Sequence, residues 1–284
     1  MVGACCDNIA RKHPSALREF WIPCALVAFI CAALVGCSTA LVERRSDLEL
    51  TWEKAVVVWP GDRGLAPTVA RMESRSFARW REVQRVRGSW PVVVYMHGCT
   101  GIGRFDFLRE LAHRGFVVVA PDSMARGYRP LQCDPNSLTG GYNLFVYDFR
   151  QAEISYAVQK LLAIPWVDQR RLFLIGISEG GVAAALYRGD EFRARVVAQW
   201  TCAGRSVVRG IAGPRDTPVL SIVGSSDPWY ASKRAPNQGG DCGRFMSDRP
   251  GSQSLLVSLP RTHNVLFHRP SVDAIINFLG RVQR

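Results

Sequence analysis

A serine lies between glycines in the segment Gly176-Ile177-Ser178-Glu179-Gly180. The apolar run RLFLIGI at residues 171–177 leads into it, and a stretch rich in glycine and alanine at residues 179–187 follows. This order predicts a buried strand, a sharp turn and a closely packed helix, which together expose the serine hydroxyl at a strained backbone position. An ordinary glycine turn is the alternative, but the context favours Ser178 as a nucleophile.

A serine hydroxyl is a weak nucleophile, so it needs a base that is in turn oriented by a carboxylate. Asp227 follows the apolar run at residues 218–223, and His263 follows the run at residues 254–259. The chain order serine, aspartate, histidine is one of the orders in which such a triad occurs. We therefore expect Ser178 to be the nucleophile, His263 the base and Asp227 the acid.

Other residues could take the roles of acid and base. Asp216 precedes its predicted strand and Asp241 lies within a glycine-rich loop, so neither is placed as well as Asp227. His268 stands at the start of the last predicted helix, whereas His263 directly follows a strand. A plain turn-forming role for Asp227, which precedes a proline, stays open.

The reaction of such a serine also needs donors for the negative charge that develops on a substrate oxygen. In this architecture the donors are the backbone N–H of the residue after the nucleophile and one from an early strand–helix loop. Glu179 and Cys99 occupy these positions, the latter just after the apolar run PVVVYM and His97-Gly98. We expect His97 to shape this turn rather than to act as a base.

Strands and helices alternate along most of the chain. Helical periodicity and stop signals predict helices at residues 105–114, 143–164, 179–187 and 272–282. This alternation predicts an α/β fold with a mostly parallel twisted sheet that helices cover on both faces. The pattern predicts no structure for residues 65–88, which could form a lid. Apolar runs predict strands at residues 51–58, 91–96, 116–120, 171–177, 196–200, 218–223 and 254–259.

A long loop is expected at residues 123–142, and long loops in compact domains are often functional. Its Arg126, Arg129 and Tyr142 are candidates for binding a carboxylate-bearing substrate, because guanidinium groups match carboxylate geometry. Trp229, two residues after the expected acid, is a candidate for lining the pocket. Solvated loop positions and plain loop packing are the alternative roles of these four residues.

The first 36 residues resemble a bacterial export signal. Arg11, Lys12 and Arg18 precede residues 21–35, which carry no charge and are short for a membrane-spanning helix. The stretch ends in LVGC, which resembles the lipobox of bacterial lipoproteins and implies cleavage before Cys37 and lipidation of its thiol. An uncleaved anchor and an ordinary secretory signal are the alternatives. We expect a signal at residues 1–36, a tether at residues 37–50 and a single domain at residues 51–284.

The chain is basic, with 36 Lys and Arg against 24 Asp and Glu and a net charge of +12. Arginine supplies nearly all of the excess and is spread along the chain. No run of five like charges and no nucleic-acid-binding motif occurs. The composition therefore gives no reason to expect a nucleic-acid partner.

Four cysteines lie beyond the predicted signal and Cys37, namely Cys99, Cys133, Cys202 and Cys242. An even number in an exported protein favours disulfides, and three pairings are possible. We favour Cys99–Cys133 and Cys202–Cys242, because each pair would join loops that follow neighbouring strands. A zinc site is a weaker alternative, since there is no close CxxC spacing and no histidine directly beside these cysteines.

The segments YMHGCTG, VVAPDS, GISEGG, VGSSDPWY and RTHN, in this order and spacing, resemble the dienelactone hydrolase-like branch of the α/β-hydrolase superfamily. The resemblance covers residues 90–284 and implies a mostly parallel sheet of eight strands. It also implies esterase chemistry without a metal or an organic cofactor. Dienelactone hydrolase itself uses a cysteine nucleophile, whereas this chain has Ser178, which favours a general carboxylic ester as the substrate.

Together these features predict a serine hydrolase that cleaves a small-molecule carboxylic ester through an acyl-enzyme. Lipid on Cys37 would anchor the exported protein to the bacterial cell envelope, because two or more acyl chains hold a protein stably on a membrane. One alternative is a serine peptidase of the same fold, although the chain has little room for a substrate-selecting domain. Another is an inactive surface lipoprotein that only binds, and the intact set of Ser178, Asp227 and His263 argues against it.

Overall fold

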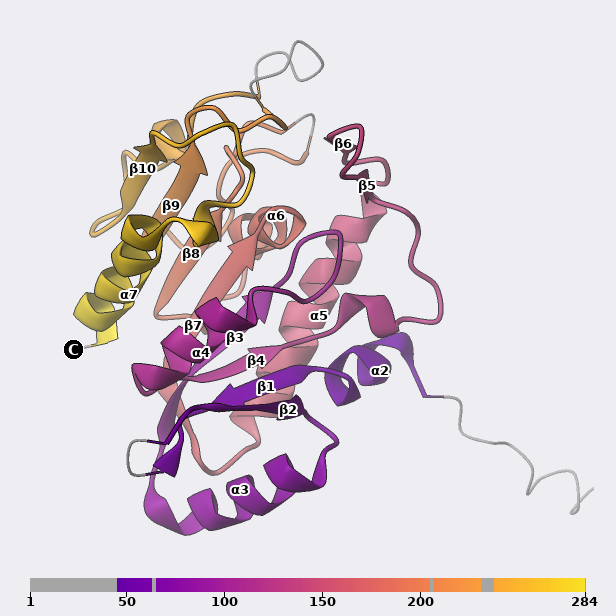
Figure 1. Cartoon of the computed structure of the whole chain (residues 1–284), viewed down its shortest axis with the longest axis vertical. Helices are drawn as coiled ribbons and strands as arrows, with labels where there is room; N and C mark the ends of the chain where they lie inside the picture. The colour runs from indigo at the N-terminus through magenta and orange to yellow at the C-terminus, as the bar shows by residue number, and fades with distance from the viewer. Residues whose placement is uncertain (1–44, 63–64, 205–206, 231–237, 284) are drawn as a thin grey trace, which may run out of the picture. The chain divides into compact units, whose positions relative to one another are not determined.

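Eight strands form one sheet in the spatial order β10-β9-β8-β7-β3-β4-β1-β2 (Figure 1). The structure is a computed structural model that describes residues 45–62, 65–204, 207–230 and 238–283. Neighbouring strands from β4 to β10 in this order run parallel, whereas β1 runs antiparallel to β4 and β2. The expected mostly parallel sheet of eight strands is thereby confirmed. The strands are β1 (Val56–Trp59), β2 (Thr68–Arg71), β3 (Trp90–Met96), β4 (Val117–Ala120), β7 (Val167–Ile177), β8 (Ala194–Ala198), β9 (Val219–Gly224) and β10 (Gln253–Val257).

The central strands are apolar along nearly their whole length. Every residue of β4, β8 and β9 is buried, as is all of β3 except Trp90. Along β3, Val92 and Val94 join one hydrophobic cluster. Val93 and Tyr95 join another, because successive side chains of a strand point to opposite faces. Strands that bury both faces explain the continuous apolar runs seen in the sequence.

Helices cover both faces of the sheet, as the alternation of elements predicts. On one face α5 (Phe145–Leu162), α6 (Glu179–Leu186) and α3 (Arg75–Arg87) add buried apolar side chains to one cluster. On the other face α4 (Phe105–His113) and α7 (Arg269–Gln283) add theirs to the second cluster. The short 3-10 helices are η2 (Ser123–Ala125), η3 (Gly243–Phe245) and η4 (Val265–Phe267).

The first predicted strand, residues 51–58, is wrong in its first half. Helix α2 (Asp47–Glu53) lies there, and β1 begins only at Val56. The helix begins with a capping box, in which the Ser46 hydroxyl accepts a hydrogen bond from the Glu49 N–H and the Glu49 carboxylate accepts one from the Ser46 N–H. This reciprocal pair satisfies two N–H groups at the helix start, which explains why the segment is helical.

The predicted signal peptide, Cys37 and the first part of the tether, residues 37–44, lie outside the described residues. The last residues of the predicted tether belong to α2. Within the part of the chain that the structure describes, no helix is both long and apolar enough to cross a membrane.

Residues 65–88, for which the sequence predicts no structure, contain β2 and α3. Helix α3 begins after Ser74, which caps it. Trp80 of α3 packs against Trp90 and Trp166, with ring centroids 6.0 and 5.2 Å away. These two tryptophans stand at the amino ends of β3 and β7, whereas Ser178 follows the carboxyl end of β7. Helix α3 therefore packs at the opposite end of the sheet and is not a lid over the site.

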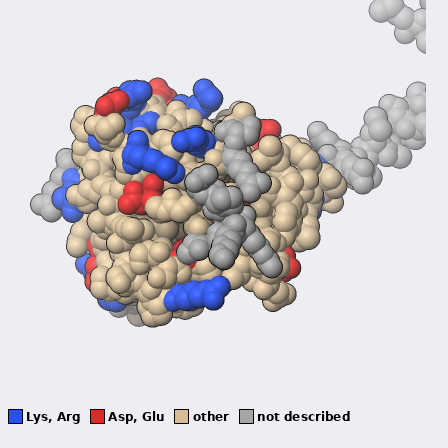
Figure 2. Space-filling view, turned by 90° about the horizontal axis from the view of Figure 1, so that it is seen from above, with Lys and Arg blue, Asp and Glu red and all other residues tan. Residues whose placement is uncertain are grey.

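The arginine excess is not collected into one patch on the face shown in Figure 2. There Lys and Arg stand in several separate groups, with uncharged surface and acidic side chains between them. Several arginines form ion pairs near the surface, such as Arg71 with Asp122 at 2.8 Å and Arg171 with Asp168 at 2.6 Å. Exposed pairs of this kind contribute little to stability.

Candidate active site

Ser178 stands between the carboxyl end of β7 and the start of α6. Its backbone has φ 54° and ψ −118°, a conformation that residues with a side chain rarely adopt. A Cβ atom on Gly176 would come within 2.0 Å of the Gly180 carbonyl oxygen, and a Cβ on Gly180 within 2.0 Å of the Met96 oxygen. The flanking glycines are therefore required by close backbone packing. This is the sharp strand-to-helix turn that the motif predicts.

Three side chains from separate segments form a hydrogen-bonded chain at the carboxyl end of the sheet. Ser178 Oγ lies 2.9 Å from His263 Nε2, and His263 Nδ1 lies 2.7 Å from Asp227 Oδ2. Asp227 is almost fully buried, and its Oδ1 accepts a hydrogen bond from the Trp229 N–H at 3.0 Å. An ionised carboxylate only accepts hydrogen bonds, so His263 donates from Nδ1, and its Nε2 accepts from the Ser178 hydroxyl.

The rival residues have other surroundings. The Asp241 carboxylate accepts a hydrogen bond from the Gly243 N–H at 2.7 Å. His268 Nδ1 lies 2.9 Å from the Ser271 hydroxyl, near the start of α7. Asp216 lies in the turn before β9. The structure brings Asp227 and His263 to the serine, and not these rivals.

The backbone N–H groups of Cys99 and Glu179 lie next to the serine. Glu179 is the first residue of α6, where N–H groups have no acceptor within the helix. In the described part of the chain, neither of these two N–H groups donates to another protein atom. A Cβ on Gly98 would lie 3.4 Å from Ser178 Cβ, so the loop that carries Cys99 closely approaches the serine. These two N–H groups therefore lie where the sequence predicts donors to an oxyanion.

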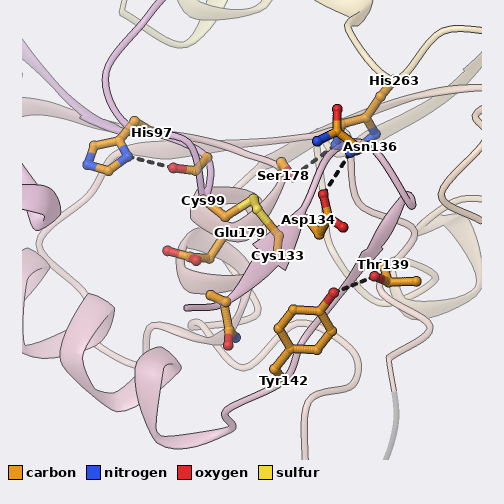
Figure 3. The surroundings of a disulfide bond; sticks show 12 residues. His97, Cys99, Cys133, Asp134, Asn136, Thr139, Tyr142, Ser178, Glu179 and His263 are labelled. Atoms are coloured by element: carbon orange, nitrogen blue, oxygen red, sulfur yellow. Dashed lines mark hydrogen bonds between the residues drawn. A yellow bond between two sulfur atoms is a disulfide. The ribbon is translucent and has the colours of Figure 1, made fainter. Parts of the chain in front are cut away.

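His97 supports the loop that carries Cys99 (Figure 3). Its Nε2 accepts a hydrogen bond from the Ser123 N–H at 3.1 Å, so its proton is on Nδ1, which donates to the Gly98 carbonyl at 2.7 Å. Burial, and next the positive charge of Arg150, hold the pKa of His97 well below its ordinary value of 6.5. His97 is therefore neutral and shapes the turn, as expected.

Two disulfides, Cys99–Cys133 and Cys202–Cys242, lie within the described residues and confirm the favoured pairing. Their Cα atoms are 6.0 and 5.0 Å apart, within the usual range. The first disulfide links the loop after β3 to a hairpin of two short strands (Figure 3). Among the described residues, no group of three or more His, Cys, Asp or Glu is arranged to hold a metal ion. The hairpin strands are β5 (Cys133–Asp134) and β6 (Thr139–Gly140).

A pocket of ≈ 320 Å³ opens beside Ser178. Trp229 lines it, as predicted from the sequence, and Tyr230 lines it as well. The rings of these two residues flank His263, with centroids 5.2 and 6.0 Å from the imidazole. The other aromatic and aliphatic lining residues are Leu138, Leu144, Tyr147, Val182, Trp200 and Val208. Such walls suit an apolar group.

Arg126 and Arg129 form ion pairs and do not belong to the described pocket wall, in contrast to the expectation that they bind substrate. Arg126 Nε lies 2.6 Å from Glu153 Oε1, and Arg129 Nη2 lies 2.5 Å from Glu179 Oε1. The side chains of both arginines are at most 7% exposed. Both guanidinium groups therefore already pair with carboxylates of the protein, where a substrate carboxylate would have to bind.

Tyr142 is also absent from the described pocket wall. Its hydroxyl forms a hydrogen bond with the Thr139 hydroxyl beside the hairpin, and its ring is half exposed (Figure 3). Of the four candidate substrate-binding residues, only Trp229 faces the pocket.

One residue of α5 lines the pocket and two others form a buried ion pair next to Glu179, although the sequence singles out none of them for a role at the site. Arg150 and Glu153 are fully buried and form an ion pair of 2.7 Å. A pair of opposite charges three residues apart on an otherwise apolar helix face is the signal that could have found them. Tyr147 lines the pocket, and burial raises its pKa to about 12, so its hydroxyl stays protonated near neutral pH.

A family model described as the dienelactone hydrolase family matches residues 81–237, more than half of the chain. Among curated proteins, none matches this sequence. One similar solved structure is the dienelactone hydrolase-like promiscuous phosphotriesterase P91 from metagenomic libraries. It is 18% identical, the match covers 80% of this chain and 98% of that one, and the TM-score is 0.51. Another, named m3DLH, is 20% identical, with coverage of 81% and 99% and a TM-score of 0.51. This chain is a hydrolase that belongs to the dienelactone hydrolase family.

Proposed function

We propose that this protein is a serine hydrolase that cleaves small-molecule carboxylic esters through an acyl-enzyme intermediate. The observation that carries the proposal is the hydrogen-bonded chain from Ser178 through His263 to Asp227, with distances of 2.9 and 2.7 Å. In this proposal Ser178 is the nucleophile, His263 the general base and Asp227 the acid that orients it. The N–H groups of Cys99 and Glu179 form the oxyanion hole.

Ester cleavage proceeds in two steps in this proposal. His263 Nε2 takes the hydroxyl proton while Ser178 Oγ bonds to the carbonyl carbon, and the carbonyl oxygen becomes negative. His263 then gives that proton to the alcohol oxygen as the bond between the carbonyl carbon and that oxygen breaks. Water attacks the resulting acyl-enzyme with His263 again as the base, and Ser178 regains its proton as the acid leaves. Asp227 stabilises the imidazolium in both steps.

The pocket favours an ester with an apolar or aromatic acyl group. Its volume of ≈ 320 Å³ is at the low end for small-molecule sites, so the acyl group is compact. Arg126 and Arg129 are held by protein carboxylates, so they do not supply a cationic site for a carboxylate-bearing ester. A serine at the position where dienelactone hydrolase has cysteine also favours a general ester over a dienelactone.

A fluorophosphonate probe tests the proposal, because it reacts with an activated serine. We expect the probe to label the folded protein at Ser178, as located by mass spectrometry of its peptides. The label should be lost in Ser178→Ala and should form far more slowly in His263→Ala. His268→Ala is the matched control, because its histidine lies outside the hydrogen-bonded chain.

Two results would count against the proposal. Folded protein that neither takes up the probe nor hydrolyses any activated ester would support the alternative of a protein that only binds. Faster turnover of acyl-peptide anilides than of the matching esters would support the peptidase alternative.

We propose further that the protein is exported and lipid-anchored through Cys37. The LVGC segment after an uncharged stretch supports this, and so do two disulfides, which form in oxidising compartments. Expression of the full chain in a bacterium should give a membrane-bound product whose N-terminal peptide carries a lipid mass on Cys37. Cys37→Ala should abolish this mass, whereas Cys31→Ala, within the uncharged stretch, should not. A product that lacks lipid on Cys37 would overturn this proposal.

A further inference from the structure

Glu179 carries a buried carboxylate on the same residue as one of the proposed oxyanion donors. Its backbone N–H is one of the two proposed donors, while its side chain is 3% exposed. In Figure 3 the carboxylate points away from Ser178, on the other side of the Cys99–Cys133 disulfide. A negative charge buried this close to a developing oxyanion opposes its formation, because charges interact strongly where water is excluded. A hydrolase with a buried glutamate directly after its nucleophile therefore needs positive charge beside the glutamate carboxylate.

Two guanidinium groups contact the same oxygen of Glu179. Arg129 Nη2 lies 2.5 Å from Oε1, and Arg150 Nε lies 3.3 Å from it. Arg150 also donates from Nη2 to the His97 carbonyl at 2.8 Å, and His97 precedes the loop of the other donor, Cys99. One buried cation therefore connects the segments that carry both proposed donors.

The surrounding charges form a defined network. Arg150 Nη1 lies 2.7 Å from Glu153 Oε2, and Arg126 Nε lies 2.6 Å from Glu153 Oε1. Arg129 Nε donates to the Ser123 hydroxyl at 3.0 Å, which in turn donates to Glu153 at 2.9 Å. Arg126, Arg129 and Arg150 thus share the two buried carboxylates of Glu153 and Glu179, and Arg126 also lies 3.7 Å from the partly exposed Asp47 carboxylate.

We infer that Arg129 and Arg150 are positioning residues, which neutralise and hold the Glu179 carboxylate so that the oxyanion can form at the Glu179 N–H. This inference rests on the proposed function. It differs from a role of Arg129 in binding substrate, because the Arg129 side chain is only 7% exposed and already contacts Glu179 and Ser123. It also differs from a purely structural role, because it predicts that Glu179→Gln restores part of the kcat that Arg129→Met loses.

The test is a double-variant cycle with Arg129→Met and Glu179→Gln on a neutral activated ester. Arg129→Met leaves the Glu179 charge less compensated, so kcat should fall about tenfold with KM little changed. Glu179→Gln should lower kcat a few-fold in the wild-type background, because the ion pairs are lost. The same substitution should raise kcat at least about threefold in the Arg129→Met background, where the uncompensated charge is removed.

Arg126→Met is the matched control. Arg126 is in the same network and as buried as Arg129, but it pairs with Glu153 and Asp47 and not with Glu179. Glu179→Gln should therefore not raise kcat in the Arg126→Met background. Arg129→Lys, which keeps the charge, should retain more activity than Arg129→Met. This variant provides the comparison if Arg129→Met does not fold.

The outcomes separate this inference from the proposed function. If the wild-type protein is not labelled at Ser178 by a fluorophosphonate, the proposed function fails. If it is labelled but Glu179→Gln lowers kcat in every background, Arg129 has only a structural role and the inference is wrong. If Arg129→Met raises KM for carboxylate-bearing esters and leaves neutral esters unaffected, Arg129 binds substrate and the inference is again wrong.

Discussion

The disulfide between Cys99 and Cys133 covalently joins two walls of one pocket. Cys99 follows β3 and supplies one proposed oxyanion donor, while Cys133 begins the β5–β6 hairpin, and both line the pocket beside Ser178. The neutral His97 holds the same loop from the other side, through the Gly98 carbonyl. A loop fixed at two points gives the preorganised donor geometry that oxyanion stabilisation requires.

Removing this disulfide should therefore lower both activity and stability. In Cys99→Ala/Cys133→Ala the backbone N–H of residue 99 is kept, but its loop and the hairpin are free to move apart. We expect kcat to fall about tenfold, and the free energy of unfolding to fall by about 3 kcal/mol because the unfolded chain gains freedom. Ester turnover and urea unfolding would measure the two effects.

Cys202→Ala/Cys242→Ala is the matched control for this prediction. Its disulfide spans 40 residues, compared with 34 for Cys99–Cys133, and its cysteines do not belong to the described pocket wall. We expect a similar loss of stability with a smaller loss of kcat. Equal losses of kcat in both double variants would show that the link between the pocket walls has no special role.

His97 should make the protein less stable as the pH falls below 6.5. Its pKa in the folded state is held well below this ordinary value by burial and then by Arg150. Between the two pKa values the unfolded chain binds a proton on this residue and the folded protein does not, so protons favour unfolding. The stabilisation is full above pH 6.5 and is lost at up to about 1.4 kcal/mol per pH unit as the pH falls.

His97→Gln tests this, because glutamine can donate and accept hydrogen bonds but does not titrate. Urea unfolding between pH 5 and pH 7 should show a flatter pH dependence for this variant than for the wild-type protein. His113→Gln, which replaces an exposed histidine, should keep the wild-type slope. An unchanged slope in His97→Gln would mean that His97 is protonated in the folded state as well.

Asp227→Asn should cost far more activity than its similar shape suggests. The asparagine oxygen can still accept the hydrogen bond from the Trp229 N–H, so its NH₂ group faces His263 Nδ1. That donor favours the tautomer with the proton on Nε2, which cannot accept the proton of Ser178. We expect kcat at neutral pH to fall by about 10⁴-fold, as in other serine triads.

Asp216→Asn provides the comparison for Asp227→Asn, because Asp216 is one of the two rival acids in the sequence and lies in an exposed turn before β9. Its kcat should stay within about twofold of wild type, in line with an ordinary surface change. A loss at Asp216 that matches the loss at Asp227 would remove the assigned role of Asp227.

The parts of the site that could be predicted are those with local signals. Ser178 was found because its motif lies between a continuous apolar run and a small-residue helix. Asp227 and His263 were found because each directly follows a predicted strand, at the edge where parallel strands end. These relations depend only on chain order and on apolar runs that indicate buried strands, and both can be read from the sequence.

The roles of Arg126 and Arg129 could not be read in the same way. A guanidinium suits a substrate carboxylate and a protein carboxylate equally well, so the residue type does not identify its partner. The partners, Glu153 and Glu179, lie 27 and 50 residues away in the chain and meet the arginines only in the fold. The predicted start of the first strand at residue 51 was wrong for a different reason. The capping box at Ser46 begins a helix, and this overrides the strand preference of the residues that follow.

Arg195 should be a costly arginine to replace, because it supports the carboxyl end of α6, the helix that follows Ser178. It is fully buried on β8 and donates to the carbonyl groups of Ala184, Tyr187 and Gly189, at and beyond the carboxyl end of α6. Burial, and next the charge of Arg249, lower its pKa to about 10, so it is still charged at neutral pH. Its side chain therefore satisfies carbonyl groups that the helix leaves without a partner.

Arg195→Met should lower the free energy of unfolding by about 3 kcal/mol, because the methionine leaves these carbonyl groups buried without a donor. Arg193→Met, two residues earlier on an exposed position, should lower it by less than about 1 kcal/mol. Urea unfolding of the two variants gives both values under the same conditions. Equal losses of unfolding free energy in the two variants would mean that water or other donors bind these carbonyl groups when Arg195 is absent. The carboxyl end of α6 would then not need the Arg195 side chain.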